Sequence, residues 1–202
     1  MLGALTPLGK EAPRRRSWVG SVALFTLGGL ISSMLVGGTL GSIGAVIDPQ
    51  LGAPAAATAL VALGLVVAAR EFGMLAVPLP QMHRATRDEW ARRWSHRRAA
   101  LLWGLDIGSF FSTWLTFSGA WWVVAVALLC GDSAFAASLF ASWWLARSLT
   151  VWSGPLLVPN ATLTPRLVIA WHHLYRPFQV THGFAVLAGA GIVAGLAVGA
   201  TA

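Results

Sequence analysis

The sequence predicts an all-α integral membrane protein, with about five transmembrane helices packed in a bundle. Hydrophobic residues make up 56% of the 202 residues and charged residues only 10%, whereas about 25% of a soluble domain is charged. The mean hydropathy is +0.70, and the basic residues lie in blocks beside long apolar runs. This composition argues against a soluble enzyme, a nucleic-acid-binding domain and a disordered chain.

The expected spans are runs of about 20 or more apolar residues, the length of helix that crosses a bilayer core. They cover Trp18–Ile47, Ala55–Val77, Ala99–Leu128, Ser133–Leu157 and Val180–Ala200. The first and third exceed what a ~30 Å core requires, so we expect them to tilt, kink or project beyond it. The pairs Gly28-Gly29 and Gly37-Gly38 are the expected kink points of the first span.

These spans organise residues 1–202 as a single transmembrane domain. We expect a basic cytoplasmic segment (1–16), two helical hairpins (17–157) joined by a basic amphipathic segment (82–98), an interfacial segment (161–179) and a last helix (180–202). The short segments on the cytoplasmic side are expected to be interfacial helices. Pro165 and Pro177 bracket the second of them as helix breakers.

The basic residues also predict the topology. They gather before the first span, between the second and third, and between the fourth and fifth: Lys10, Arg14, Arg15, Arg16, Arg84, Arg87, Arg92, Arg93, Arg97, Arg98, Arg166 and Arg176. Positively charged connections stay in the cytoplasm. The pattern therefore predicts a multi-pass protein of a bacterial-type inner membrane, with the N-terminus cytoplasmic and the C-terminus external.

The connection after the second span has the pattern of a membrane-surface helix. Trp90 and Trp94 are four residues apart, and the segment carries Arg92, Arg93, Arg97 and Arg98. Such a basic helix with an aromatic face suits the anionic cytoplasmic leaflet. We therefore expect the lipid bilayer, and anionic lipids at this face, as partners. Docking of a partner protein is the alternative.

The second and fourth spans suggest an internal repeat. Arg70 precedes Pro78 by the same number of residues as Arg147 precedes Pro155. Each hairpin contains two spans, so the chain returns to the same side of the membrane before the second hairpin begins. Two hairpins with this match would therefore form a parallel repeat. Chance similarity between apolar hairpins is the alternative.

The small-residue first span, LGGLISSMLVGGTLGSIGAVI, resembles first spans in small polytopic bacterial proteins of the LysE and CcdA type. The resemblance implies a membrane protein of repeated helical units, as in exporters and membrane electron carriers. The electron carriers use an embedded cysteine pair, whereas this chain has one cysteine, Cys130. No functional residue is therefore transferred.

Four ionisable residues inside the spans form an expected charge cluster: Arg70, Glu71, Asp106 and Arg147. Each lies about 10–12 Å from the cytoplasmic boundary at the rise of a helix. Because a buried charge needs a partner, we expect Asp106 to pair with Arg70 or Arg147. Static packing, or extension of the arginines to the headgroups, is the alternative.

Asp106 also begins a polar stripe that continues through Ser109, Thr113 and Thr116 at helical spacing. Such a stripe can line a water-filled path, or it can supply hydrogen bonds between helices.

Small residues four apart predict two close-packing helix faces. They are Ser33, Gly37 and Gly41 in the first span, and Gly191, Gly195 and Gly199 in the last. The partner helix would belong to this chain or to another subunit.

No cofactor or metal is expected. The five histidines do not face each other within the membrane as haem ligands would. Trp121, Trp122, Trp143 and Trp144 lie deep in the spans, where packing is the simplest role and a site for a pigment or other planar ligand the alternative. No catalytic constellation is found, so the protein is not expected to be an enzyme.

The intramembrane charges favour a small transporter or channel-like component. The alternative is a non-catalytic transmembrane subunit that stabilises a larger respiratory, photosynthetic or transport complex. In either case we expect a homo-oligomer or other membrane subunits as partners, and no nucleic acid.

Overall fold

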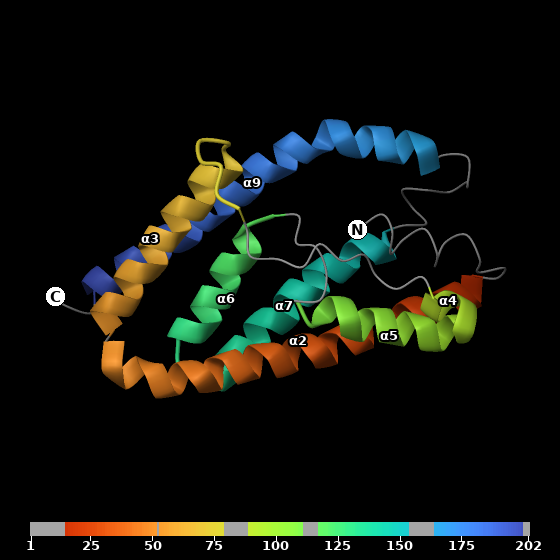
Figure 1. The fold of residues 1–202 in the computed structure, drawn as a ribbon, viewed down its shortest axis with the longest axis horizontal. Helices are drawn as coiled ribbons and strands as arrows, with labels where there is room; N and C mark the ends of the chain where they lie inside the picture. Colours follow the sequence, from red (N-terminus) through yellow and green to blue (C-terminus); the bar gives the residue numbers. More distant parts are fainter. Residues whose placement is uncertain (1–14, 52, 79–88, 111–116, 154–163, 200–202) are drawn as a thin grey trace. The chain divides into compact units, whose positions relative to one another are not determined.

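The computed structural model describes residues 15–51, 53–78, 89–110, 117–153 and 164–199. Within these ranges the regular structure is helical throughout, and no strand is present. The helices are α2 (Arg15–Leu51), α3 (Ala53–Glu71), α4 (Glu89–Arg93), α5 (His96–Gly108), α6 (Gly119–Leu129), α7 (Ser133–Trp152) and α9 (Thr164–Gly199) (Figure 1). The all-helical prediction is confirmed for this part of the chain.

Three helices are long and apolar enough to cross a membrane. The candidate spans are Trp18–Ile47, Ala53–Glu71 and Tyr175–Val198. Large hydrophobic side chains on their surfaces are exposed, among them Leu35, Leu65 and Leu196. Exposed leucines on long helices are expected where lipid is the solvent. A membrane protein is thus supported, and the count of five spans stays a prediction.

The expected third span is not one helix. α5 ends at Gly108 and α6 begins at Gly119. Phe110, beyond the end of α5, has a φ of 71°, a left-handed conformation that a continuous right-handed helix cannot contain. The hydroxyl of Ser109 donates to the carbonyl of Asp106 (2.6 Å) and satisfies one of the last carbonyls of α5.

The expected interfacial segment 161–179 is likewise not separate from the last helix. α9 runs continuously from Thr164 to Gly199 with Pro177 inside it. Pro165 lies in the first turn, where its missing N–H costs nothing. Pro177 removes one backbone hydrogen bond without ending the helix, and the Thr181 hydroxyl donates to its carbonyl (2.8 Å).

The start of α7 agrees with the prediction for the fourth span. Asp132 lies just before the helix, and its Oδ1 accepts hydrogen bonds from the backbone N–H groups of Ala134 (2.8 Å) and Phe135 (3.0 Å). This side chain satisfies donors that the first turn of a helix leaves free.

The segment expected to form one basic helix is divided. α4 ends at Arg93, and Ser95 has an extended conformation (φ −59°, ψ 150°) before α5 begins. Trp90 is half-buried against the core, so it belongs to the interior packing. Trp94 is 43% exposed, and the Arg98 Cζ lies 5.9 Å from its ring centroid. Arg93 and Arg97 are exposed, and the side chain of Arg92 lies outside the described set.

The chain divides into two compact units. The first contains α2 up to Val36, α4, α5, α7 from Phe140 and α9 up to His172. The second contains α2 from Gly37, α3, α6, α7 up to Leu139 and α9 from His173. α2, α7 and α9 thus contribute to both units.

Tryptophans fill the core of the first unit. Trp144 is fully buried, and its indole N–H donates to the carbonyl of Thr26 (2.8 Å). A Cβ at Gly29 would lie 1.9 Å from the Trp144 ring, so only glycine fits there. The pair Gly28-Gly29 therefore allows close packing within a helix that stays continuous, and it does not interrupt α2.

In the second unit, α3, α6 and α9 pack through another tryptophan. The indole N–H of Trp122 on α6 donates to the carbonyl of Leu60 on α3 (3.0 Å). Gly64 of α3 lies against Trp122 and against Ala190 of α9. These contacts bring the end of α3 to the beginning of α6 and to α9, where the polar residues of this unit gather.

Candidate functional site

The site begins with the way α3 ends. Gly73 has a φ of +78°, its N–H donates to the carbonyl of Arg70 (2.9 Å), and the N–H of Met74 donates to the carbonyl of Ala69 (2.8 Å). This is a Schellman motif, which requires the left-handed residue that glycine supplies. The expected span to Val77 is therefore too long, and Arg70 and Glu71 lie in the last turn of α3.

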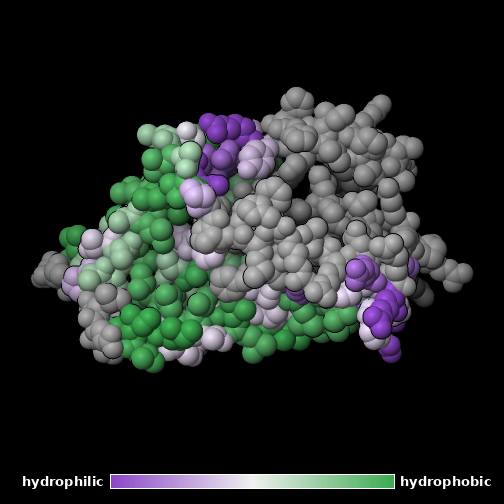
Figure 2. Space-filling model, viewed as in Figure 1, coloured by the Kyte–Doolittle hydropathy of each residue, from purple (hydrophilic) through white to green (hydrophobic). Residues whose placement is uncertain are grey.

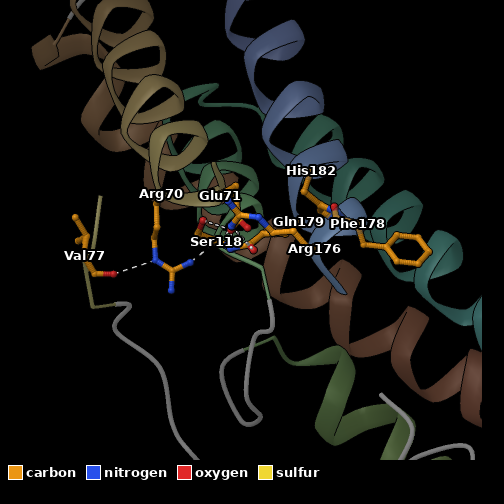
Figure 3. Close-up of polar contacts among 8 residues, drawn as sticks. All are labelled: Arg70, Glu71, Val77, Ser118, Arg176, Phe178, Gln179 and His182. Carbon is orange, nitrogen blue, oxygen red and sulfur yellow. Dashed lines mark hydrogen bonds and ion pairs between the residues drawn. The ribbon is translucent and has the colours of Figure 1, made fainter. Parts of the chain in front are cut away.

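Glu71 is the buried centre of the site, with its side chain 1% exposed. Its Oε1 accepts the backbone N–H of Ser118 (2.6 Å) and also the Ser118 hydroxyl. Ser118 immediately precedes α6, and the N-terminal end of a helix favours a negative charge. Glu71 thus joins the end of α3 to the beginning of α6 (Figure 3).

The second carboxylate oxygen of Glu71 is also buried. Within the described ranges, Oε2 has no hydrogen-bond partner. Both donors of Ser118 converge on Oε1 instead.

Arg70 lies beside this carboxylate and also holds the turn that follows α3. Its Nη1 is 3.5 Å from Glu71 Oε1, and its Nε donates to the carbonyl of Val77 (2.9 Å). The side chain is 26% exposed, so its ion pair is partly screened by solvent and contributes little to stability.

A second arginine reaches the same turn from α9. Arg176 donates from Nη2 to the carbonyl of Phe72 (3.1 Å) and from Nη1 to Gln179 Oε1 (3.3 Å). The close-up shows both guanidinium groups near Glu71 (Figure 3). We name the four residues Arg70, Glu71, Ser118 and Arg176 the polar junction.

Aromatic rings flank the polar junction. His182 stacks on Phe117, with ring centroids 4.2 Å apart and planes at 16°. Phe117 also stacks on Tyr175 at 5.7 Å. The Nδ1 of His182 lies 2.9 Å from the carbonyl of Phe178. Since a carbonyl only accepts, Nδ1 carries the proton.

The predicted charge cluster is divided between the two units. Arg70 and Glu71 belong to the second, whereas Asp106 and Arg147 belong to the first. Arg147 places its Cζ 5.3 Å from the centroid of the Trp143 ring, a cation–π contact. Asp106 is half-buried on α5. Its pairing with Arg70 or Arg147 stays a prediction, and Arg70 makes its ion pair with Glu71.

Of the predicted polar stripe, Asp106 lies on α5 and Ser109 directly follows the end of that helix at Gly108, so the stripe stays a prediction. Thr113 and Thr116 lie outside the described residues.

The two predicted small-residue faces have different surroundings. Ser33 is buried and its hydroxyl donates to the carbonyl of Gly108 (2.9 Å), and Gly41 lies closely against Ser133 at the start of α7. A Cβ at Gly191 or at Gly195 would meet nothing within 4 Å. The first face is thus used within the chain, and its third member, Gly37, is buried on the same helix. Gly199 ends α9.

Sequence reasoning missed Ser118 and Arg176 as members of the site. The long apolar run predicts Ser118 inside a continuous span, although a serine directly before the apolar run Gly-Ala-Trp-Trp-Val-Val is a signal for a helix start. The sequence indicates a role for Arg176 only in the topology pattern. Among the described residues, no group of three or more His, Cys, Asp or Glu could hold a metal ion.

Comparison with known proteins identifies three curated relatives, all named methylamine utilization protein MauF. The protein of Paracoccus versutus is 29% identical over 151 residues, which cover 74% of this chain and 55% of the relative. The Methylobacillus flagellatus protein is 27% identical over 146 residues (72% and 52%). The Paracoccus denitrificans protein is 24% identical over 159 residues (79% and 57%).

This chain therefore spans about half the length of the curated relatives it matches. No family model matches it, and no solved structure matches it. The resemblance of the first span to the LysE and CcdA type stays a prediction.

The relatives correct the functional interpretation. The expectation of a transporter or channel-like component is wrong, because the relatives are named for methylamine utilization and not for transport. The same names also overturn the alternative of a respiratory, photosynthetic or transport subunit. The four intramembrane charges on which the transporter hypothesis rested are divided between two units. The chain is thus similar to part of the MauF proteins over about three quarters of its own length.

Proposed function

We propose that this chain is a multi-pass membrane component of methylamine utilization that does not itself catalyse a reaction. The observation that carries the proposal is its similarity to MauF of Paracoccus versutus over 74% of the chain. The three candidate spans agree with a membrane location. We further propose a bacterial inner membrane, with the N-terminus in the cytoplasm, from the alternating basic segments.

The polar junction supports a non-catalytic role. The Oε1 of Glu71 accepts two donors from Ser118, and Arg70 and Arg176 donate to main-chain carbonyls of the turn after α3. These hydrogen bonds satisfy groups at helix ends, which is a structural task. In this proposal the junction fixes α3, α6 and α9 to one another.

The proposal is tested by complementation in Paracoccus denitrificans, which has a matching relative. The strain would lack its own MauF and would carry either this chain or a chimera in which this chain replaces the matching part of that protein. Growth is measured on methylamine and, as a control, on a carbon and nitrogen source without methylamine.

Growth on methylamine restored by the chain or by the chimera would support the proposal. If neither restores growth although both are present in the membrane at normal abundance, the proposal is wrong. Equal growth defects on both media would also contradict it, since the requirement would then not be specific to methylamine.

A further inference from the structure

The turn that follows α3 has an apolar surface and is contacted by two arginines, Arg70 from the last turn of α3 and Arg176 from α9. Met74 is 76% exposed, and Leu75 and Val77 are each 43% exposed. Arg70 and Arg176 hold this turn through its carbonyls. Figure 2 shows hydrophilic atoms gathered where α3 ends, beside the hydrophobic surface of that helix.

The two guanidinium groups retain donors for an external ligand. Each guanidinium has five N–H donors, and the hydrogen bonds of Arg176 to Phe72 and Gln179 use two of them within the described part of the chain. Arg176 is exposed. The carboxylate of Glu71 offsets one of the two positive charges, so the polar junction keeps a net positive charge that favours an anion.

The surrounding surface determines which anion fits. α3 is a candidate membrane span that ends at Glu71, so the turn lies where a span meets the headgroup layer. A soluble anion would gain no binding energy from the exposed methionine, leucine and valine side chains beside the arginines. A phospholipid contacts both surfaces, since its phosphate accepts from the arginines while its acyl chains cover the apolar turn.

We propose that Arg70 and Arg176 bind the phosphate of an anionic phospholipid, with Met74, Leu75 and Val77 against its acyl chains. This site is separate from the basic segment around α4, and it does not depend on the role in methylamine utilization.

The test measures lipid binding by native mass spectrometry of the full chain, purified in a neutral detergent and titrated with phosphatidylglycerol or phosphatidylcholine. The wild-type protein should bind phosphatidylglycerol more tightly. Arg176→Gln should weaken that binding about tenfold, because a charged hydrogen bond contributes about that factor. Arg176→Lys keeps the positive charge but loses the planar fork of donors, so it should weaken the binding less than Arg176→Gln does.

Met74→Ser tests the apolar half of the site and is the variant that keeps its fold, because the Met74 side chain is 76% exposed. It should weaken phosphatidylglycerol binding about threefold, as less apolar area is covered. Equal binding of the two lipids, unchanged binding by Arg176→Gln or Met74→Ser, or equal losses in the Gln and Lys variants would overturn the proposal. Binding of inorganic phosphate as tight as that of phosphatidylglycerol would overturn the assignment to a lipid.

Discussion

The Glu71–Ser118 contact makes a quantitative prediction about stability. Glu71→Ala removes the acceptor of two hydrogen bonds, and Ser118 is 0% exposed, so water cannot replace it. A buried donor left without a partner costs about 1–3 kcal/mol. For two donors, and a small term for the partly exposed Arg70, we expect the free energy of unfolding to fall by about 3–5 kcal/mol.

A double-mutant cycle separates this contact from general damage. Ser118→Ala alone removes the hydroxyl donor and should cost about 1.5–3 kcal/mol, the contribution of a hydrogen bond to a charged group. In the Glu71→Ala background the same change has no acceptor to lose. The two substitutions should therefore be coupled by about 2 kcal/mol.

The assay is unfolding by sodium dodecyl sulfate in mixed micelles, followed by tryptophan fluorescence. Glu89→Ala is the matched control, because Glu89 is exposed on α4, and it should change the free energy by less than about 0.5 kcal/mol. Additivity of Glu71→Ala and Ser118→Ala within about 0.5 kcal/mol would refute the reasoning, since residues in contact do not behave so.

Three further predictions concern packing and topology. Gly29→Ala should destabilise the first unit by at least about 1–3 kcal/mol in a thermal melting experiment, because its Cβ would lie 1.9 Å from the Trp144 ring. Gly191→Ala, where nothing lies within 4 Å, should be neutral or stabilising in the same experiment. Thr26→Val removes the acceptor of the Trp152 indole N–H (3.0 Å) and should cost about 1 kcal/mol, so an unchanged melting temperature would argue against this contact. In a Cys130→Ser background, Asp132→Cys should react with an impermeant maleimide from outside intact cells; labelling only after the inner face is opened would reverse the proposed topology.

Local signals explain what the sequence predicted. The apolar runs identify α2, α3 and the C-terminal part of α9, because lipid exposure requires long apolar helices whatever their partners are. Asp132 before Ser133 marks the start of α7 through its own backbone contacts. Each of these features depends on residues close in sequence.

The errors arise where distant residues decide the structure. Glu71 and Ser118 are 47 residues apart, and their contact fixes the start of α6 within what the apolar run presents as one span. The low helix propensity of proline predicts a break at Pro177, although α9 continues through it. Gly73 could have been recognised as a helix end, but the apolar residues after it, through Val77, concealed that signal.

The central claim is that the chain contributes to methylamine utilization as a folded membrane component and not through chemistry at its buried carboxyl group. Glu71→Gln tests this claim directly, because the amide oxygen can still accept from Ser118 while the ionisable group is lost. The measurement is the growth rate on methylamine of the complemented Paracoccus denitrificans strain, divided by the amount of folded protein in the membrane. The account predicts that this ratio equals that of wild type. Normal membrane abundance of Glu71→Gln without growth on methylamine would contradict the account. The ionisable carboxyl group would then be required for function and not only for folding.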